Sequence, residues 1–203
     1  MNNYFQDTKE LEAIGHEALQ SASKALSKIL GYDVRIKLAS AYMLSPINLM
    51  EVLGKESAFD VAIAYSKLKG MLSGIILLAI PLNDAAETLK NMILRTLGVS
   101  MLNEEIATDL FKEMANIIFG AVATSLYNKY KIIVSYSVPK VVIDNFMAIL
   151  DNIVTLYIME FDKLVIYDAE IVGEENTPRI KILIIPEEGM KFSRSELVAG
   201  DFQ

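Results

Sequence analysis

Three polar residues, Asp109, Glu113 and Asn116, follow one another at intervals of four and three in a segment with helical periodicity. On an α-helix this spacing places all three side chains on one face. A carboxylate and a carboxamide one turn apart offer hydrogen-bond acceptors, a donor and one negative charge, but no strong nucleophile. Any amphipathic helix also shows polar residues to solvent, but Asn116 is unusual there because Asn is a middling helix former.

Helical and strand periodicities indicate the elements that position these residues. The helix carrying them is expected to run from Asn103 or Thr108 to about Tyr130, with an apolar stripe facing the core. The predicted stripe comprises Leu110, Met114, Ile117, Ala121 and Leu126. The other predicted elements are a helix over 7–30 closed by Gly31, strands at 34–38, 59–65 and 74–80, a helix over 85–97 capped by Asn83 or Asp84 and closed by Gly98, and a short C-terminal helix within 193–203.

The second half of the chain repeats the pattern of the first at an offset of 100 residues, so that Leu11, Ile14 and Leu26 meet Phe111, Met114 and Leu126. Later the offset becomes 105, which an insertion near Asp144–Asp151 absorbs. We expect residues 1–203 to form a single domain of two repeats, about 8–100 and 103–203. The predicted class is α+β, an α/β sandwich in which a shared β-sheet lies under two long helices.

Composition excludes several classes of function. The 203 residues carry a net charge of −7, with 53% hydrophobic residues, no Cys and one His. Thiol chemistry, disulfides, Cys-ligated zinc and iron–sulfur clusters are excluded, and no phosphate-binding glycine loop or metalloprotease motif occurs. The negative charge opposes binding to nucleic acid. The apolar run from Gly74 to Pro81 is far shorter than the ~20 residues that span a bilayer, so we expect a cytoplasmic protein with no membrane insertion.

With Pro139 added, the string Asp109-x3-Glu113-x2-Asn116-x22-Pro139 resembles the motif of the CheC/CheX/FliY chemotaxis phosphatases. Proteins of this family remove the phosphoryl group from the response regulator CheY. The resemblance extends to the glycine after the Asn (Gly120), the internal repeat, the chain length and the late strand that ends in Ile-Pro. It implies a CheC-like pseudo-two-fold fold with two site-bearing helices.

The resemblance also implies roles for the motif residues. Asn116 would orient the attacking water and Glu113 would pair with a Lys of the regulator, which makes these two the catalytic residues. Asp109 would help to dock the partner, and Pro139 would be structural, shaping the end of the following strand. No cofactor or metal of the protein's own is implied, since Mg²⁺ is expected on the response regulator. The implied partners are a phosphorylated CheY-like regulator and CheD, which relatives bind.

The first half does not preserve the motif. The same register places Lys9, Ala13, His16 and Ala39 at the motif positions, and Glu12 stands one residue out of register, about 100° around the helix. Two alternatives to an enzyme stay open. One is a non-catalytic CheC-like binding or adaptor module of the CheD-binding or flagellar-switch type, and the other is a generic α/β domain with an accidental motif. Glu113 and Asn116 at the family spacing favour the enzyme.

Overall fold

The computed structural model describes residues 8–45, 48, 60–97, 103–157, 163–172 and 178–186. Helices and strands follow one another in the mixed order that an α+β protein requires. In chain order they are α1 (Thr8–Leu30), β1 (Arg35–Leu44), β2 (Asp60–Gly70), β3 (Gly74–Pro81), α3 (Leu82–Leu97), α4 (Glu104–Tyr130), β4 (Val134–Tyr136), β5 (Lys140–Asn145), α5 (Phe146–Tyr157), β6 (Leu164–Val172) and β7 (Arg179–Pro186).

The described strands form one seven-stranded sheet in the order β1-β6-β7-β3-β2-β4, with β5 also paired to β2. Every pair is antiparallel. β3 and β7 are neighbours in the sheet, with Leu77 opposite Leu183. The apolar runs at 77–81 and 182–186, which match at the offset of 105 residues, therefore lie on neighbouring strands. Gly74 begins β3 at a φ of +149°, where a side chain would overlap the carbonyl oxygen of Ile185.

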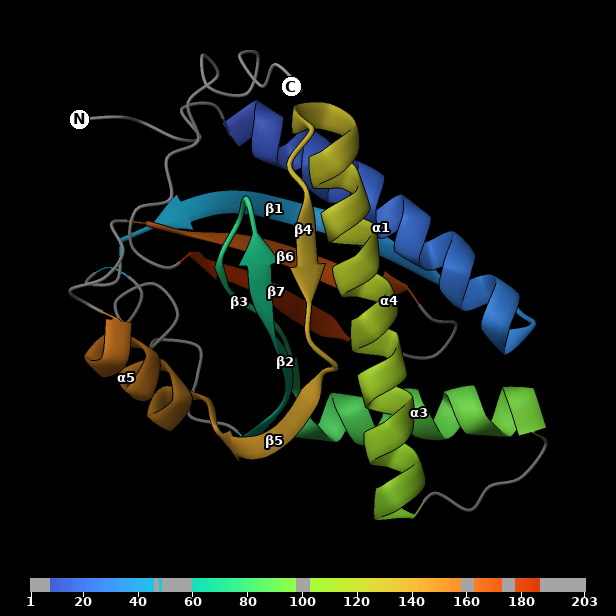
Figure 1. The fold of residues 1–203 in the computed structure, drawn as a ribbon. Helices are drawn as coiled ribbons and strands as arrows, with labels where there is room; N and C mark the ends of the chain where they lie inside the picture. Colours follow the sequence, from blue (N-terminus) through green and yellow to red (C-terminus); the bar gives the residue numbers. More distant parts are fainter. Residues whose placement is uncertain are drawn as a thin grey trace.

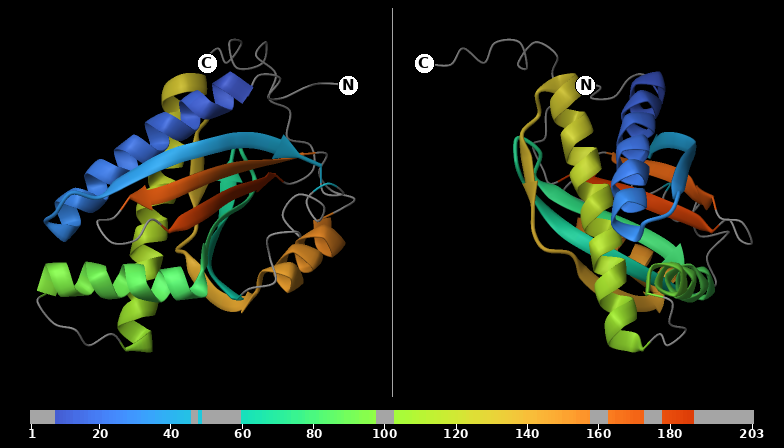
Figure 2. Two further views of the ribbon diagram at one scale, coloured as in Figure 1. Left: turned by 180° about the vertical axis from the view of Figure 1, so that it is seen from behind. Right: turned by 90° about the vertical axis from the view of Figure 1, so that its right-hand side faces the viewer.

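Helices cover both faces of the sheet. α1, α3 and α4 share one hydrophobic cluster with one face, and Figures 1 and 2 show α1 and α4 side by side over it. A second cluster on the other face includes Phe146 of α5, with Ile149 packed against it. The predicted α+β class, a sheet with long helices over it, is confirmed. Within the described ranges no helix is both long and apolar enough to cross a membrane.

The predicted ends of the long helices are also confirmed. α1 stops at Leu30, and Gly31 takes the left-handed conformation with φ +76°. Asn103, one of two predicted starts, caps α4 because its Oδ1 accepts the Ile106 N–H at 2.8 Å. Lys131 closes α4 with φ +58°, and its N–H donates to the Tyr127 carbonyl at 2.8 Å.

Three predictions need correction. α3 begins at Leu82 and not after a cap at Asn83 or Asp84, since the helix follows β3 without a connecting loop. The insertion near Asp144–Asp151 contains the end of β5, which pairs with β2, and the start of α5, whose Phe146 and Ile149 pack on the second sheet face. At the repeat offset of 100 residues the strand predicted at 34–38 corresponds to a strand at 134–138, but β4 ends at Tyr136. The predicted end of α3 at Gly98 and the C-terminal helix lie outside the described residues.

The buried stripe of α4 was predicted about 100° away from its observed place. Leu110, Ile117 and Ala121 are only half-buried, and in each case the next residue along the chain is the buried one. Met114 and Leu126 are buried as predicted. The rotation arises because α4 meets both the sheet and α1, so its covered face is set by two neighbours. The buried residues are Phe111, Met114, Ala115, Ile118, Phe119, Val122, Ser125 and Leu126.

Candidate functional site

The outward face of α4 carries the three predicted polar residues together. Its buried stripe fixes the helix against the sheet and α1, and Asp109, Glu113 and Asn116 lie on the opposite side. Asp109 and Glu113 are exposed, and Asn116 is half-buried. Three residues of suitable chemistry are thus presented from one packed helix of 27 residues.

Asp109 forms an ion pair on its own helix. Its Oδ1 accepts from Lys112 Nζ at 2.9 Å, and the Asp109 side chain is 68% exposed. An exposed pair of this spacing contributes only about 0.3–0.5 kcal/mol to the helix. The carboxylate is therefore accessible, but its charge is balanced locally by Lys112.

Glu113 and Asn116 have no such neighbours. Among the described residues no ion pair or side-chain hydrogen bond engages the Glu113 carboxylate or the Asn116 carboxamide. A surface carboxylate and carboxamide one turn apart, which no described residue engages, can accept and donate hydrogen bonds to a molecule that docks on α4.

Tyr136 of β4 lies beside this pair, and the sequence did not single it out as a site residue. Its hydroxyl donates to the main-chain carbonyl of Asn116 at 3.2 Å, and its ring packs edge-on against Phe119 with centroids 6.3 Å apart. Burial, and secondly the negative charge of Glu113, raise the pKa of Tyr136 above its ordinary value of 10.0. The phenol therefore stays protonated, and able to donate, at neutral pH.

Gly120 makes room for this hydroxyl. A Cβ built at Gly120 would lie 2.8 Å from the Tyr136 oxygen, which is closer than real Cβ contacts. The glycine that follows the Asn in the motif thus has a packing reason. A polar aromatic residue in the next strand after a helical Asn and Gly is the sequence signal that could have identified Tyr136.

Pro139 lies in a bulge at the edge of the sheet. β2 pairs Leu68 with Tyr136 and Tyr65 with Lys140, so two β2 residues face three on the other side. Pro139 is buried there, and its missing N–H costs no ladder bond. It stands between β4 and β5, and its predicted structural role stays a prediction.

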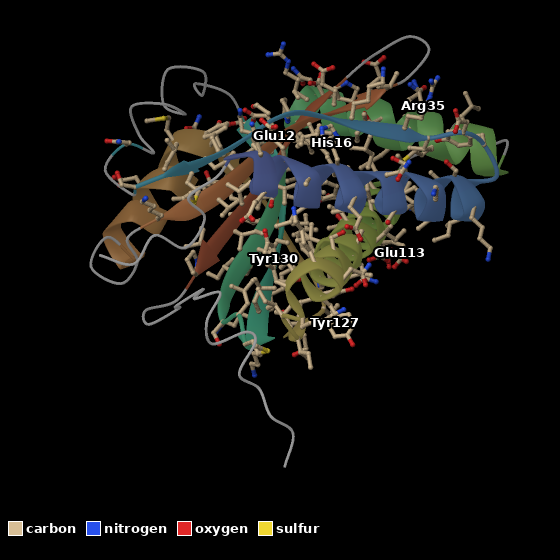
Figure 3. All side chains as sticks on the ribbon, turned by 90° about the horizontal axis from the view of Figure 1, so that it is seen from above. Glu12, His16, Arg35, Glu113, Tyr127 and Tyr130 are labelled. Atoms are coloured by element: carbon tan, nitrogen blue, oxygen red, sulfur yellow. The ribbon has the colours of Figure 1, made fainter. Side chains whose placement is uncertain are left out.

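The first-half counterparts are exposed and do not assemble a similar site. Lys9, Ala13 and His16 lie on the surface of α1 and Ala39 on that of β1, and Figure 3 shows Glu12 and His16 on α1 with Glu113 on α4. A groove of about 960 Å³ lies between α1 and β1, and His16 is part of its lining. Among the residues the structure describes, no group of three or more His, Asp or Glu side chains could hold a metal ion.

α1 and α4 bury equivalent positions. Residues at an offset of 100 are buried alike, and both helices close with a left-handed residue, Gly31 and Lys131. Ala39 also lies at a register shift in β1, as Pro139 does between β4 and β5. The division into repeats of about 8–100 and 103–203 stays a prediction, and its limits at 100 and 203 lie outside the described residues. The buried pairs are Leu11 and Phe111, Ile14 and Met114, Ala18 and Ile118, Ala22 and Val122, and Leu26 and Leu126.

The fold is that of CheC-like proteins. FliY of Thermotoga maritima matches with a TM-score of 0.71 and 21% identity over 97% of this chain and 98% of that one. FliM from the FliG–FliM complex of H. pylori matches with a TM-score of 0.61 and 13% identity, covering 87% and 91%. CheX of Desulfovibrio desulfuricans matches with a TM-score of 0.56 and 13% identity, covering 86% and 99%.

Residues 62–160 match the family model described as chemotaxis phosphatase CheX, a range that includes α4, β4 and every motif position from Asp109 to Pro139. This match, over just under half of the chain, and the fold shared with FliY and CheX support the CheC/CheX/FliY family of chemotaxis proteins. Comparison with curated proteins gave no match.

Proposed function

We propose that this protein is a phosphatase that hydrolyses the aspartyl phosphate of a CheY-like response regulator. The observation that carries the proposal is the pair of unengaged side chains, Glu113 and Asn116, on the outer face of a helix inside the CheX-matching range. Polar residues on an exposed helix face often lack partners, so the weight rests on these two residue types standing at the motif spacing. These two side chains are available to a partner surface.

In the proposed reaction a water oxygen attacks phosphorus in line with the aspartyl oxygen. The phosphorus–oxygen bond to the regulator breaks, which releases its carboxylate and inorganic phosphate, and the water proton passes to the phosphate. Charge on the phosphoryl group is neutralised by Mg²⁺ and a Lys of the regulator, so this chain needs no metal of its own. The missing element is an ordered water.

In the proposal, Asn116 orients the attacking water. A carboxamide oxygen accepts a hydrogen bond from water, and because the group is neutral it does not repel the phosphoryl oxygens as a carboxylate would. Glu113 pairs with the regulator's Lys. Asp109, already paired with Lys112, contributes to docking, and CheD is a second proposed partner that rests on the resemblance alone.

The test follows the decay of a phosphorylated CheY-type regulator from the same organism in Mg²⁺. Asn116→Ala should lower turnover by about 10²- to 10³-fold, the usual size of a positioning effect, with little change in partner binding. Glu113→Ala should weaken both turnover and binding. Matched controls on the same helix are Asn128→Ala, which loses a bond to Glu17, and Glu105→Ala in the exposed first turn. Full turnover by Asn116→Ala would refute the assignment.

The second candidate is a non-catalytic binding module, which the FliM match favours because that protein was solved in complex with FliG. Decay that stays unchanged across the organism's regulators, combined with binding that Glu113→Ala weakens, would select this function. Accelerated decay that requires Asn116 would select the phosphatase.

A further inference from the structure

The Tyr136 hydroxyl lies on the turn of α4 that carries Asn116. We propose that Tyr136 is a positioning residue of the phosphatase site, holding this turn from β4 so that Asn116 keeps a fixed place. The proposal rests on the proposed function and adds a residue outside the helix to its machinery.

The contact reaches the backbone and leaves the Asn116 side chain unoccupied. In an α-helix the Asn116 carbonyl accepts the N–H of Gly120, and Tyr136 adds a second donor to the same oxygen at 3.2 Å. Outward carbonyls of a helix otherwise tilt toward water. A protein donor at this point fixes the carbonyl, and with it the direction of the Asn116 Cα–Cβ bond, while the carboxamide stays free for water.

Tyr136 is itself held in place. Its ring packs edge-on against buried Phe119, and the neighbouring Ser137 N–H donates to the Lys67 carbonyl of β2 at 3.0 Å. The hydrogen bond therefore connects the Asn116 turn of α4 to the sheet through a side chain that is itself held in place.

The first half lacks both partners of this arrangement. Ile36 stands at the place of Tyr136 and Gln20 at that of Gly120, where His16 replaces Asn116. Ile36 is buried and has no hydroxyl, and the α1–β1 groove, which both Ile36 and Gln20 help to line, opens at this position. The half without the catalytic pair is thus also the half without the tyrosine and the glycine.

The test compares Tyr136→Phe with a matched control on α4, Tyr127→Phe. The Tyr127 ring is exposed, Lys131 Nζ lies over it, and the residue has no role in the site. Amide exchange is measured first, because it needs no substrate. Tyr136→Phe should speed exchange at Gly120 by about 2- to 12-fold, the loss expected for one net hydrogen bond, while Tyr127→Phe leaves it unchanged.

Regulator dephosphorylation is measured next. Tyr136→Phe should lower kcat by about 3- to 10-fold with KM unchanged, less than the ~100-fold that a 1 Å misplacement can cost. Unchanged exchange at Gly120, or an unchanged kcat beside an active wild type, overturns the positioning role. A wild type that hydrolyses no regulator defeats the proposed function as well as this catalytic role, and the exchange result then still decides whether Tyr136 holds the turn.

Discussion

Replacing Gly120 with Ala tests the close approach of Tyr136 to α4 directly. Two opposing effects are expected. In a helix interior Ala is more favourable than Gly by about 0.8–1.0 kcal/mol. The new Cβ would lie 2.8 Å from the Tyr136 oxygen, so the phenol has to move by several tenths of an ångström and its 3.2 Å bond to Asn116 lengthens beyond a useful hydrogen bond.

Losing that hydrogen bond costs about 0.5–1.5 kcal/mol, which offsets the gain in helix propensity. We therefore expect Gly120→Ala to change the free energy of unfolding by less than about 0.7 kcal/mol in the wild-type background. In a Tyr136→Phe background the oxygen is absent, and the ring carbon that carried it lies 3.8 Å from the new Cβ, an ordinary contact. There Gly120→Ala should stabilise by about 1 kcal/mol.

Urea or guanidinium unfolding of the four proteins in this cycle measures the coupling between the two positions. The expected coupling energy is about 1 kcal/mol, which lies within the range found for residues in contact. Gly120→Ala should also lower kcat for regulator dephosphorylation as Tyr136→Phe does, without a further loss in the double variant. Equal stabilisation by Gly120→Ala in both backgrounds would show that the phenol does not press on this turn, and would refute the reasoning.

Three further results are expected from the fold. Asn103→Ala removes the cap of α4 and should destabilise by about 1 kcal/mol in denaturant unfolding, whereas Asn103→Ser should restore most of it. Burial raises the pKa of both Tyr136 and Tyr167. The stability that they confer is therefore present below the ordinary pKa of 10.0 and is lost as the pH rises through the folded values. The free energy of unfolding, measured from pH 8 to 11, should fall above pH 10, and Tyr167→Phe should reduce this fall. The Asp168 carboxylate accepts from Lys181 Nζ at 2.7 Å, and both side chains are largely covered. Asp168→Ala should therefore cost about 2–3 kcal/mol in denaturant unfolding, and the double variant Asp168→Ala/Lys181→Met should cost less. Equal losses in the two variants would contradict the pairing.

The two long helices, their ends and the strands β1, β2 and β3 could be predicted because local chemistry decides them. Gly31 and Asn103 end and begin helices through their own backbone and side-chain preferences. The positions of Glu113 and Asn116 on one exposed face also follow from helical spacing alone. Only the structure shows that no described residue engages these two side chains, because this depends on how close the neighbouring elements come to them.

Features that depend on how two elements pack together could not be predicted from the sequence. The buried stripe of α4 is turned because α1 and the sheet both cover it, and a single-helix pattern cannot weigh two neighbours. β5 and α5 were missed because the insertion was defined by comparison with the first half, not by its own pattern. Tyr136 reads as an ordinary strand residue until β4 is seen beside Gly120, a contact between residues that share no local periodicity.

The proposed chemistry asks little of this chain beyond geometry. In the proposed reaction Mg²⁺ and a Lys of the regulator neutralise the phosphoryl charge, and the neutral Asn116 amide needs only to hold one water in line. A mobile amide would lose most of that effect, so the helix that carries Asn116 must hold it in a fixed place. α4 meets this requirement through a buried stripe against the sheet and α1, a capped start at Asn103, and a hydroxyl from β4 on the turn of Asn116. α1 has the buried stripe but not the hydroxyl. Both halves thus have a long, packed helix, and the half that carries Glu113 and Asn116 also has the contact of Tyr136 with Asn116.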